Sequence, residues 1–389
     1  MNTLNRDAMT LPTERLVAAL RDRITAKQSL VAERDRRDGK DRINVGSYME
    51  NLGWPDLFGY DMNRFLSDPE FMLETELRQR IFWADNSDDD WVPNLQINAT
   101  VGMYYDITMF GQKVWHEPSG VPQFAAHPIQ DQPDLSLIPA LDFHSSGVMP
   151  DLLRQHAALL QLNRERYGGA LVIGFPGFGR GPLDVAIQLR GYENFVQDTM
   201  ERPEFVHALL TRIVEERAAW NRARRRYLGE SEPTDPQTGV DDDWVNIPLL
   251  SPQIIRDFAL PAYRKIVGLE GRIVHFHTCG RLEAVVVDLL KAFQGITWLD
   301  VSGWNDFELL DDLVDPKLSF GINFKNTFVL TGTPAQQRAV LERIAQVRKR
   351  RYVFVCAQAI VKLHPTYEEN LARMNAFIAL ARQVFAEKA

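Results

Sequence analysis

The feature that most constrains the fold is an alternation along the chain. Short apolar runs of strand length are each followed by a longer stretch with helical periodicity, which is the pattern of βα units. The runs lie in RINVGSY (42–48), PNLQINATVG (93–102), ALVIGFPGFG (170–179), GVDDDW (239–244), RIVHFHTCG (272–280), ITWLDVSG (296–303), LSFGINF (318–324) and YVFVCAQ (352–358).

A count near eight favours a closed (β/α)8 barrel over an open sheet, and no G-x-G-x-x-G fingerprint opens a helix after the first run. We therefore predict an α/β chain that forms a TIM barrel with a mostly helical N-terminal extension. We expect the extension at 1–90 and the barrel at 91–389. The proline-rich segment 111–135 predicts no regular element, and such an insertion commonly covers a site.

Composition excludes several classes of protein. The formal net charge of −8 argues against a non-specific grip on nucleic acid phosphates. No run approaches the roughly 18 apolar residues that a membrane span requires. Charges are scattered through the first 24 residues, MNTLNRDAMTLPTERLVAALRDRI, so no secretory signal is indicated. We expect a cytoplasmic protein with neither nucleic acid nor membrane partners.

The chain has only two cysteines, and both end predicted strands. His277 and Cys279 are two residues apart, so a strand would point them to the same side. Cys356 ends the last predicted strand, and the C-terminal strand ends of a barrel meet at one rim. An imidazole and two thiolates suit zinc, with one coordination position left open, as in catalytic sites. The alternative is a pair of buried, inert thiols.

A wider pattern accompanies these residues. The segments GPLDVAIQLRGYENFVQDTMERPEFVHALLTRI, VDDDWVNIPLLSPQIIRDFALPAYRKIV, HFHTCGRLEAVVVDLL and HPTYEENLARMNAFI resemble the uroporphyrinogen decarboxylase superfamily, particularly its cobamide-dependent methyltransferase branch. The resemblance is good over about 170–385 and loose over the first 150 residues. It implies a TIM barrel with zinc bound by His277, Cys279 and Cys356.

The resemblance also implies roles for acidic residues. It places an acidic pair in the cavity, for which we expect Asp242 and Asp243 as catalytic residues, against the alternative of a solvated turn. The branch has an acidic residue soon after the sixth strand that can complete the zinc shell. Ser302 occupies that position here, so the fourth ligand stays open, and Asp300 is expected to bind substrate.

Two aromatic side chains, Tyr105 and His116, are further candidates for substrate binding, although such residues more often belong to a core or lid. His275 is expected behind the ligands or in the core. GFPGFGRGP offers backbone donors and Arg180 to an anion, but it lacks the G-K-[ST] of a nucleotide-binding loop.

The resemblance implies a zinc-dependent methyltransferase that works with a corrinoid, transferring methyl between a methylated compound or methylcobamide and a thiol or pterin. The chain lacks the D-x-H-x-x-G of a cobamide module, so the corrinoid would be free or carried by a partner protein. The alternatives are a metal-independent decarboxylase using Asp242 and a non-catalytic corrinoid- or tetrapyrrole-binding protein. The arginine-rich N-terminal motif of true decarboxylases is missing.

Overall fold

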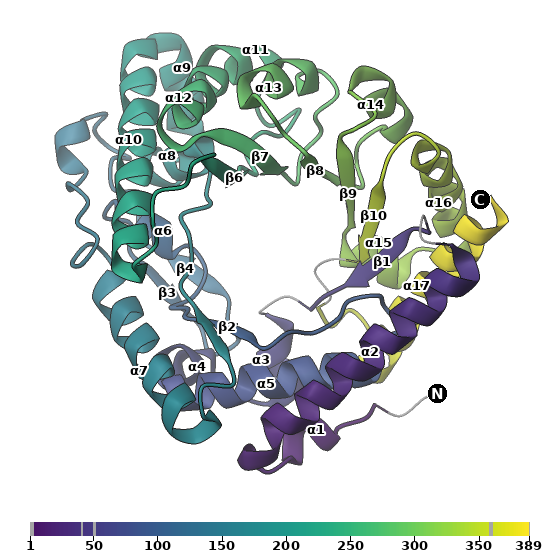
Figure 1. Cartoon of the computed structure of the whole chain (residues 1–389). Helices are drawn as coiled ribbons and strands as arrows, with labels where there is room; N and C mark the ends of the chain where they lie inside the picture. Colours follow the sequence, from purple (N-terminus) through teal and green to yellow (C-terminus); the bar gives the residue numbers. More distant parts are fainter. Residues whose placement is uncertain (1–3, 40–41, 50–51, 358–360, 389) are drawn as a thin grey trace.

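A computed structural model describes residues 4–39, 42–49, 52–357 and 361–388. Gln358, the last residue of one expected strand, lies outside them. The chain is a TIM barrel, with strands around the centre and helices outside (Figure 1). Each of the eight predicted runs contains a barrel strand. The strands are β1 (Asn44–Ser47), β2 (Gln96–Asn98), β5 (Val172–Gly174), β6 (Gln237–Asp241), β7 (Arg272–His277), β8 (Trp298–Ser302), β9 (Ser319–Phe324) and β10 (Val353–Ala357).

Two parallel sheets make up the barrel wall. One has the order β1-β10-β9-β8-β7-β6, and the other pairs β2 with β5. They are joined after β5, where Asp241 N donates to Gly179 O at 3.0 Å and Gly181 N donates to Asp241 O at 2.7 Å. Between β1 and β2 the described residues form no strand ladder. At this seam Arg80 Nη2, on a neighbouring helix, donates to Gln96 O at 2.9 Å.

Strand alternation divides the side chains between the helical layer and the barrel interior. In β9, Phe320, Ile322 and Phe324 are at most 2% exposed, as expected for the face that packs on helices. On the other face, a Cβ at Gly321 would overlap Asp300 Oδ1. Glycine at this position therefore leaves room for Asp300 in the interior.

Helices link successive strands around the barrel. Asp68 caps α5 by accepting from Phe71 N at 3.1 Å, with Pro69 in the first turn. Ser251 caps α11 as its position before Pro252 predicts. The helices between strands are α3 (Gly53–Phe58), α4 (Met62–Ser67), α5 (Pro69–Asn86), α6 (Tyr105–Thr108), α7 (Met149–Tyr167), α8 (Pro182–Arg190), α9 (Tyr192–Glu201), α10 (Pro203–Leu228), α11 (Pro252–Ile254), continued through a π-turn (Ile255–Ala259) into α12 (Leu260–Glu270), α13 (Val286–Phe293), α14 (Phe307–Leu313), α15 (Asn326–Thr331) and α16 (Pro334–Arg348).

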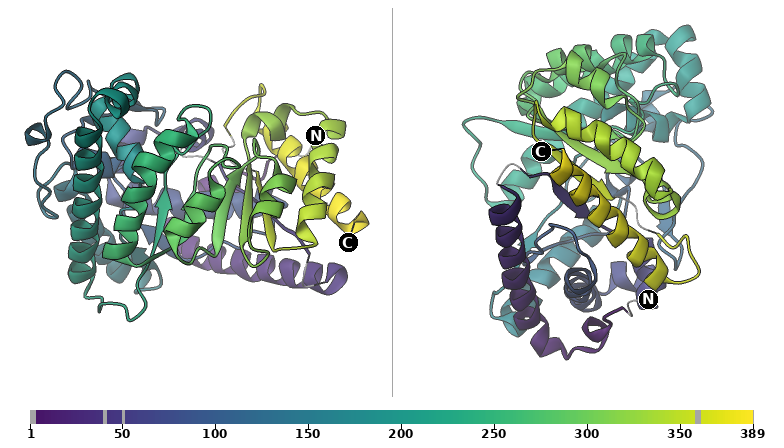
Figure 2. Two further views of the ribbon diagram at one scale, coloured as in Figure 1. Left: turned by 90° about the horizontal axis from the view of Figure 1, so that it is seen from above. Right: turned by 90° about the vertical axis from the view of Figure 1, so that its right-hand side faces the viewer.

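The N-terminal extension consists of α1 (Asp7–Thr10) and α2 (Leu16–Asp38), and the last helix is α17 (Tyr367–Glu387). Arg23 of α2 pairs with Asp85 of α5 through two contacts of 3.0 Å. Arg6 pairs with Glu368 at 3.0 Å, so the first and last helices lie on one side of the barrel (Figure 2).

One expected boundary needs correction. With the barrel taken as 91–389, β1 would belong to the extension, yet β1 pairs in parallel with β10 from Asn44↔Phe354 to Ser47↔Ala357. The barrel therefore begins at β1, and the extension ends with α2. The short run 42–48 supplies a wall strand although helices surround it in the sequence.

The segment 111–135 contains a small hairpin, where no regular element was expected. β3 (Val114–His116) pairs antiparallel with β4 (Pro122–Phe124). Pro122 is the first residue of β4, at the end of a short two-stranded element, where a missing N–H is tolerated. Among the described helices, none has the length and apolar character needed to cross a membrane.

Candidate metal centre and its cavity

A cavity of about 570 Å³ lies inside the barrel and is lined by residues at the C-terminal ends of β6, β7 and β8. Active sites of TIM barrels lie at this end. The lining is strongly acidic, with five carboxylates: Asp106, Asp184, Asp241, Asp243 and Asp300. Such a lining favours positively charged groups over anions.

Three side chains in and beside this cavity bring unlike donor atoms together. One ligand atom each from Asp243, His277 and Cys279 lies within 4.8 Å of the other two. Cys279 Sγ is 3.7 Å from His277 Nε2, and that nitrogen is 3.5 Å from Asp243 Oδ1. Cys279 N donates to the same carboxylate oxygen at 2.8 Å, which fixes Asp243 beside the β7 end.

These separations fit a single tetrahedral ion. With ordinary zinc bond lengths, tetrahedral geometry sets the sulfur–nitrogen separation at about 3.6 Å and the nitrogen–oxygen separation at about 3.4 Å. The observed values are 3.7 and 3.5 Å. Imidazole, thiolate and carboxylate are all common zinc donors, and three protein ligands leave a fourth position for substrate. The donor set therefore fits a catalytic zinc.

Asp300 orients the histidine of this cluster. Its Oδ2 accepts from His277 Nδ1 at 3.2 Å, which leaves Nε2 directed at Cys279 and Asp243. The carboxylate is itself fixed by Trp298 Nε1, which donates to Oδ1 at 2.6 Å. A carboxylate behind a metal-binding imidazole is the usual way of setting its tautomer. Asp300 therefore lies in the cavity, as expected, and also contacts the predicted ligand.

The surroundings of the cluster stabilise positive charge. Burial alone would lower the pKa of His277, but Asp300, Cys279 and Asp243 raise it to about 11. Burial opposes ionisation of Asp300, but hydrogen bonds from His275, His277 and Trp298 hold its pKa well below the usual range. A proton or a metal ion at Nε2 meets the same anionic field, so metal binding here would displace a proton.

Cys356, expected as a third ligand, lies outside this cluster. Among the described residues, the group within 4.8 Å contains Asp243 instead. The order β10-β9-β8-β7 separates the two cysteine-bearing strands by two others. Cys356 is 7% exposed and lines a second, aromatic pocket. Burial, with the charges of Asp89 and Asp300, raises the pKa of its thiol well above the usual range.

The two aspartates expected to be catalytic, Asp242 and Asp243, follow β6 and point to opposite sides of the chain. Asp243 enters the cluster, whereas Asp242 is fully buried on the opposite face. Asp242 accepts from Leu183 N at 3.0 Å, Asp184 N at 3.1 Å and Tyr263 Oη at 2.8 Å. It anchors the start of α8 and does not face substrate, so its assignment as a catalytic residue is corrected. Neighbouring residues of an extended segment point to opposite sides, which puts Asp241 in the cavity instead.

Of the two aromatic residues expected to bind substrate, only Tyr105 lines the cavity. Tyr105 lines the cavity, and its hydroxyl donates to Gly177 O at 2.5 Å. His116 is not among the residues that line it. The imidazole of His116 packs so closely on Gly102 that a Cβ there would overlap its ring, and burial lowers its pKa. His116 therefore joins the β3–β4 hairpin to the loop after β2. Its expected role in substrate binding is corrected to this structural contact.

Three residues not predicted as site residues also line the cavity: Arg180, Tyr48 and Asn323. Arg180, a candidate for binding an anion, pairs with Asp106 at 3.0 Å and Asp184 at 2.9 Å. Its charge is therefore already neutralised by carboxylates. Tyr48 and Asn323 also line the cavity. Their positions at the ends of predicted strands were the available signal, since they share the rim with His277.

The sequence profile of the family "Uroporphyrinogen decarboxylase (URO-D)" matches residues 98–379. The chain belongs to the uroporphyrinogen decarboxylase family. It is thus an enzyme of that superfamily. A solved methyltransferase from Methanosarcina mazei shares the fold, with a TM-score of 0.61 and 17% identity over 89% of this chain and 94% of that one. A search of curated proteins finds no match.

Proposed function

We propose that this member of the uroporphyrinogen decarboxylase family is a zinc-dependent methyltransferase that acts with a corrinoid. The observation that carries the proposal is the cluster of Asp243, His277 and Cys279, in which the sulfur and the carboxylate oxygen each lie at a tetrahedral separation from the imidazole nitrogen. The printed function of the structurally similar archaeal protein, methyltransferase, supports it.

In this proposal His277, Cys279 and Asp243 hold the metal, and Asp300 fixes the imidazole. When bound, zinc supplies a Lewis acid that keeps a thiol as thiolate at neutral pH or polarises a substrate oxygen. Asp241 and Tyr105 face the same cavity, so they would contact the substrate beside the metal. The corrinoid would come to the open rim either free or on a partner protein, because the sequence holds no cobamide motif.

The buried position of Asp242 argues against the alternative of a metal-independent decarboxylase using this residue. Its carboxylate is 0% exposed and already accepts three hydrogen bonds from protein groups. A decarboxylase acid has to reach its substrate, and this carboxylate cannot do so without breaking those bonds. The cavity's chemistry instead concentrates at Asp243, His277 and Cys279.

The test combines metal content with methyl transfer. Purified wild-type chain should carry about one zinc, and the His277→Ala variant should lose both the zinc and methyl transfer between methylcobalamin and a thiol. His207→Ala, which removes an exposed imidazole from α10, is the matched control and should retain both. Methyl transfer by zinc-free protein would refute the proposal.

A further inference from the structure

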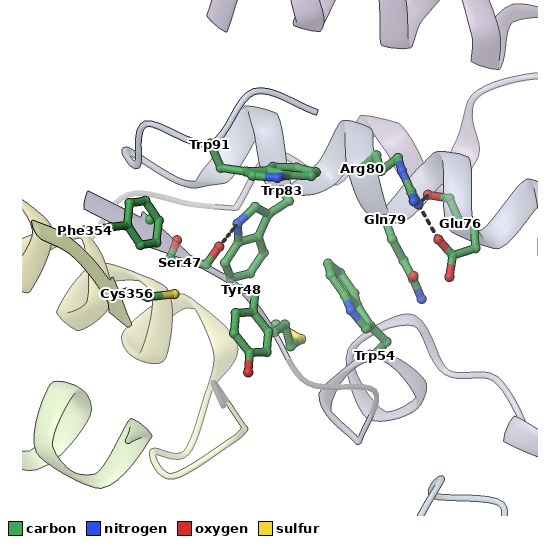
Figure 3. Close-up of a pocket in the computed structure, with 12 residues that line it drawn as sticks. Ser47, Tyr48, Trp54, Glu76, Gln79, Arg80, Trp83, Trp91, Phe354 and Cys356 are labelled. Carbon is green, nitrogen blue, oxygen red and sulfur yellow. Dashed lines mark hydrogen bonds and ion pairs between the residues drawn. The ribbon is translucent and has the colours of Figure 1, made fainter. Parts of the chain in front are cut away.

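A second cavity of about 430 Å³ lies beside the C-terminal end of β1, between β10 and α5 (Figure 3). It shares the lining residue Tyr48 with the acidic cavity, so the two lie next to each other. Phe354 and Cys356 enter it from β10, and Trp54 and Trp83 enter it from α3 and α5. The metal cluster and the orienting aspartate do not use this space.

The lining of this cavity is aromatic, which distinguishes it from an ordinary apolar pocket. Of the chain's eight tryptophans, Trp54, Trp83 and Trp91 lie here, together with Tyr48 and Phe354. None of the described lining residues is leucine, isoleucine or valine. The faces of aromatic rings have a negative electrostatic potential, which branched aliphatic side chains lack. The lining is therefore suited to a group that interacts with ring faces.

Two of the rings are held by contacts among the lining residues themselves. Trp54 and Trp83 meet at 71° with centroids 5.8 Å apart, so they form two walls of a corner. Trp83 Nε1 donates to Ser47 O at 3.1 Å, which satisfies its N–H. Trp91 and Tyr48 stay 37% and 39% exposed. The corner formed by Trp54 and Trp83 is therefore present without a ligand.

The charges around this pocket disfavour an anion. Its charged lining residues are Glu76 and Arg80, which pair with each other. Arg80 also donates to Glu76 O and Gln96 O, at 3.2 and 2.9 Å, so its terminal nitrogens are engaged. The adjoining cavity adds further carboxylates. An occupant with positive charge is favoured by both the rings and this field.

We propose that this aromatic pocket binds the methylated onium group, ammonium or sulfonium, of a small cationic methyl donor. The inference rests on the proposed methyltransferase function and adds the class of donor. Cages of aromatic rings recognise methylated cations because ring faces attract a cation whose charge is too diffuse to hold water tightly.

Transfer of the methyl group changes the charge of the bound molecule and so weakens its binding to the pocket. In the transfer, the bond between the methyl carbon and the onium atom breaks, and its electron pair stays on nitrogen or sulfur. The reduced corrinoid of the proposed reaction supplies the electron pair of the new bond to carbon. A sulfide product is uncharged and loses its attraction to the ring faces, whereas an amine product takes up a proton from water and becomes an N–H cation that water holds more tightly than the methylated donor.

The test is calorimetric titration of the full chain with tetramethylammonium, trimethylsulfonium and the uncharged tert-butanol, at constant ionic strength. At least one onium ion should bind saturably, and tert-butanol should bind at least tenfold more weakly. The stronger onium ion identifies the donor class. Absence of onium binding, or equal binding of tert-butanol, would overturn the proposal.

Variants locate the binding and separate this proposal from the zinc proposal. Trp54→Leu and the more exposed Trp91→Leu should each weaken onium binding tenfold or more, whereas Trp304→Leu, at an exposed site beside Lys325, should not. Wild-type affinity in both pocket variants would overturn the assignment of the site. The metal-depleted His277→Ala chain should still bind the onium ion, so loss of metal chemistry and loss of donor binding are distinguishable.

Discussion

Replacing Asp300 by asparagine should weaken zinc binding by about 10- to 100-fold. Asp300 accepts from Trp298 at 2.6 Å and from His277 Nδ1 at 3.2 Å through different oxygens. Asparagine has one acceptor oxygen, so it cannot keep both bonds, and it removes the charge. A hydrogen bond to a charged group contributes about 1.5–3 kcal/mol, and each 1.4 kcal/mol is tenfold in affinity. The same range is typical for the loss of a carboxylate behind a metal-binding histidine.

The assay is competition for zinc between the protein and a chromophoric chelator, without corrinoid or substrate. The matched control is Asp241→Asn, which removes an equal charge from the same cavity. The carboxylate of Asp241 is 58% exposed and lies 3.8 Å from His275 rather than on His277. The control should change affinity less than about threefold, since exposed charges are screened. Equal effects of the two substitutions would show that Asp300 acts through charge alone, and wild-type affinity in Asp300→Asn would refute its orienting role.

Three further predictions address the ligand set and stability. Asp243→Asn should reduce the zinc content of the purified chain, whereas Cys356→Ser should leave it unchanged; the opposite result would restore the cysteine as third ligand. Asp242→Ala should lower the free energy of unfolding by about 3 kcal/mol, because three buried donors lose their acceptor; denaturant unfolding measures this, and a loss below about 1 kcal/mol would contradict the structural role. Burial lowers the pKa of His156, with Arg224 adding to the effect. The unfolded chain therefore takes up a proton more readily, so stability should fall as pH drops below about 6.5, and denaturant unfolding across pH should show a shallower fall in His156→Phe.

The fold and two of the three members of the cluster, His277 and Cys279, could be predicted from the sequence for clear reasons. Apolar runs followed by helical periodicity marked every barrel strand, because wall strands bury their outward face under helices. The two-residue spacing of His277 and Cys279 predicted side chains on one side; β7 ends at His277, and Cys279 just beyond it brings Sγ within 3.7 Å of the imidazole. Local periodicity was sufficient for both conclusions.

The remaining parts depend on distances across the barrel, which local patterns do not contain. Cys356 and Cys279 end strands of the same rim, but the intervening β8 and β9 set their separation. Asp242 and Asp243 are adjacent, and which of them faces inward depends on the register of β6 against β7, where Asp241 is opposite His277. The seam between β1 and β2 could not be predicted either, because the pairing of two strands about 50 residues apart is not encoded in local patterns.

The two cavities draw on largely different elements of the barrel. The proposed metal chemistry lies on β6, β7 and β8, whose ladders fix one another. The aromatic pocket is lined by β1, β10, Trp54 of α3 and four residues of α5, and no ladder joins the described residues of β1 and β2. Substitutions in α5 can reshape that pocket without shifting the strands that carry the cluster. A lineage with this architecture can change its choice of substrate while its reaction chemistry is inherited intact.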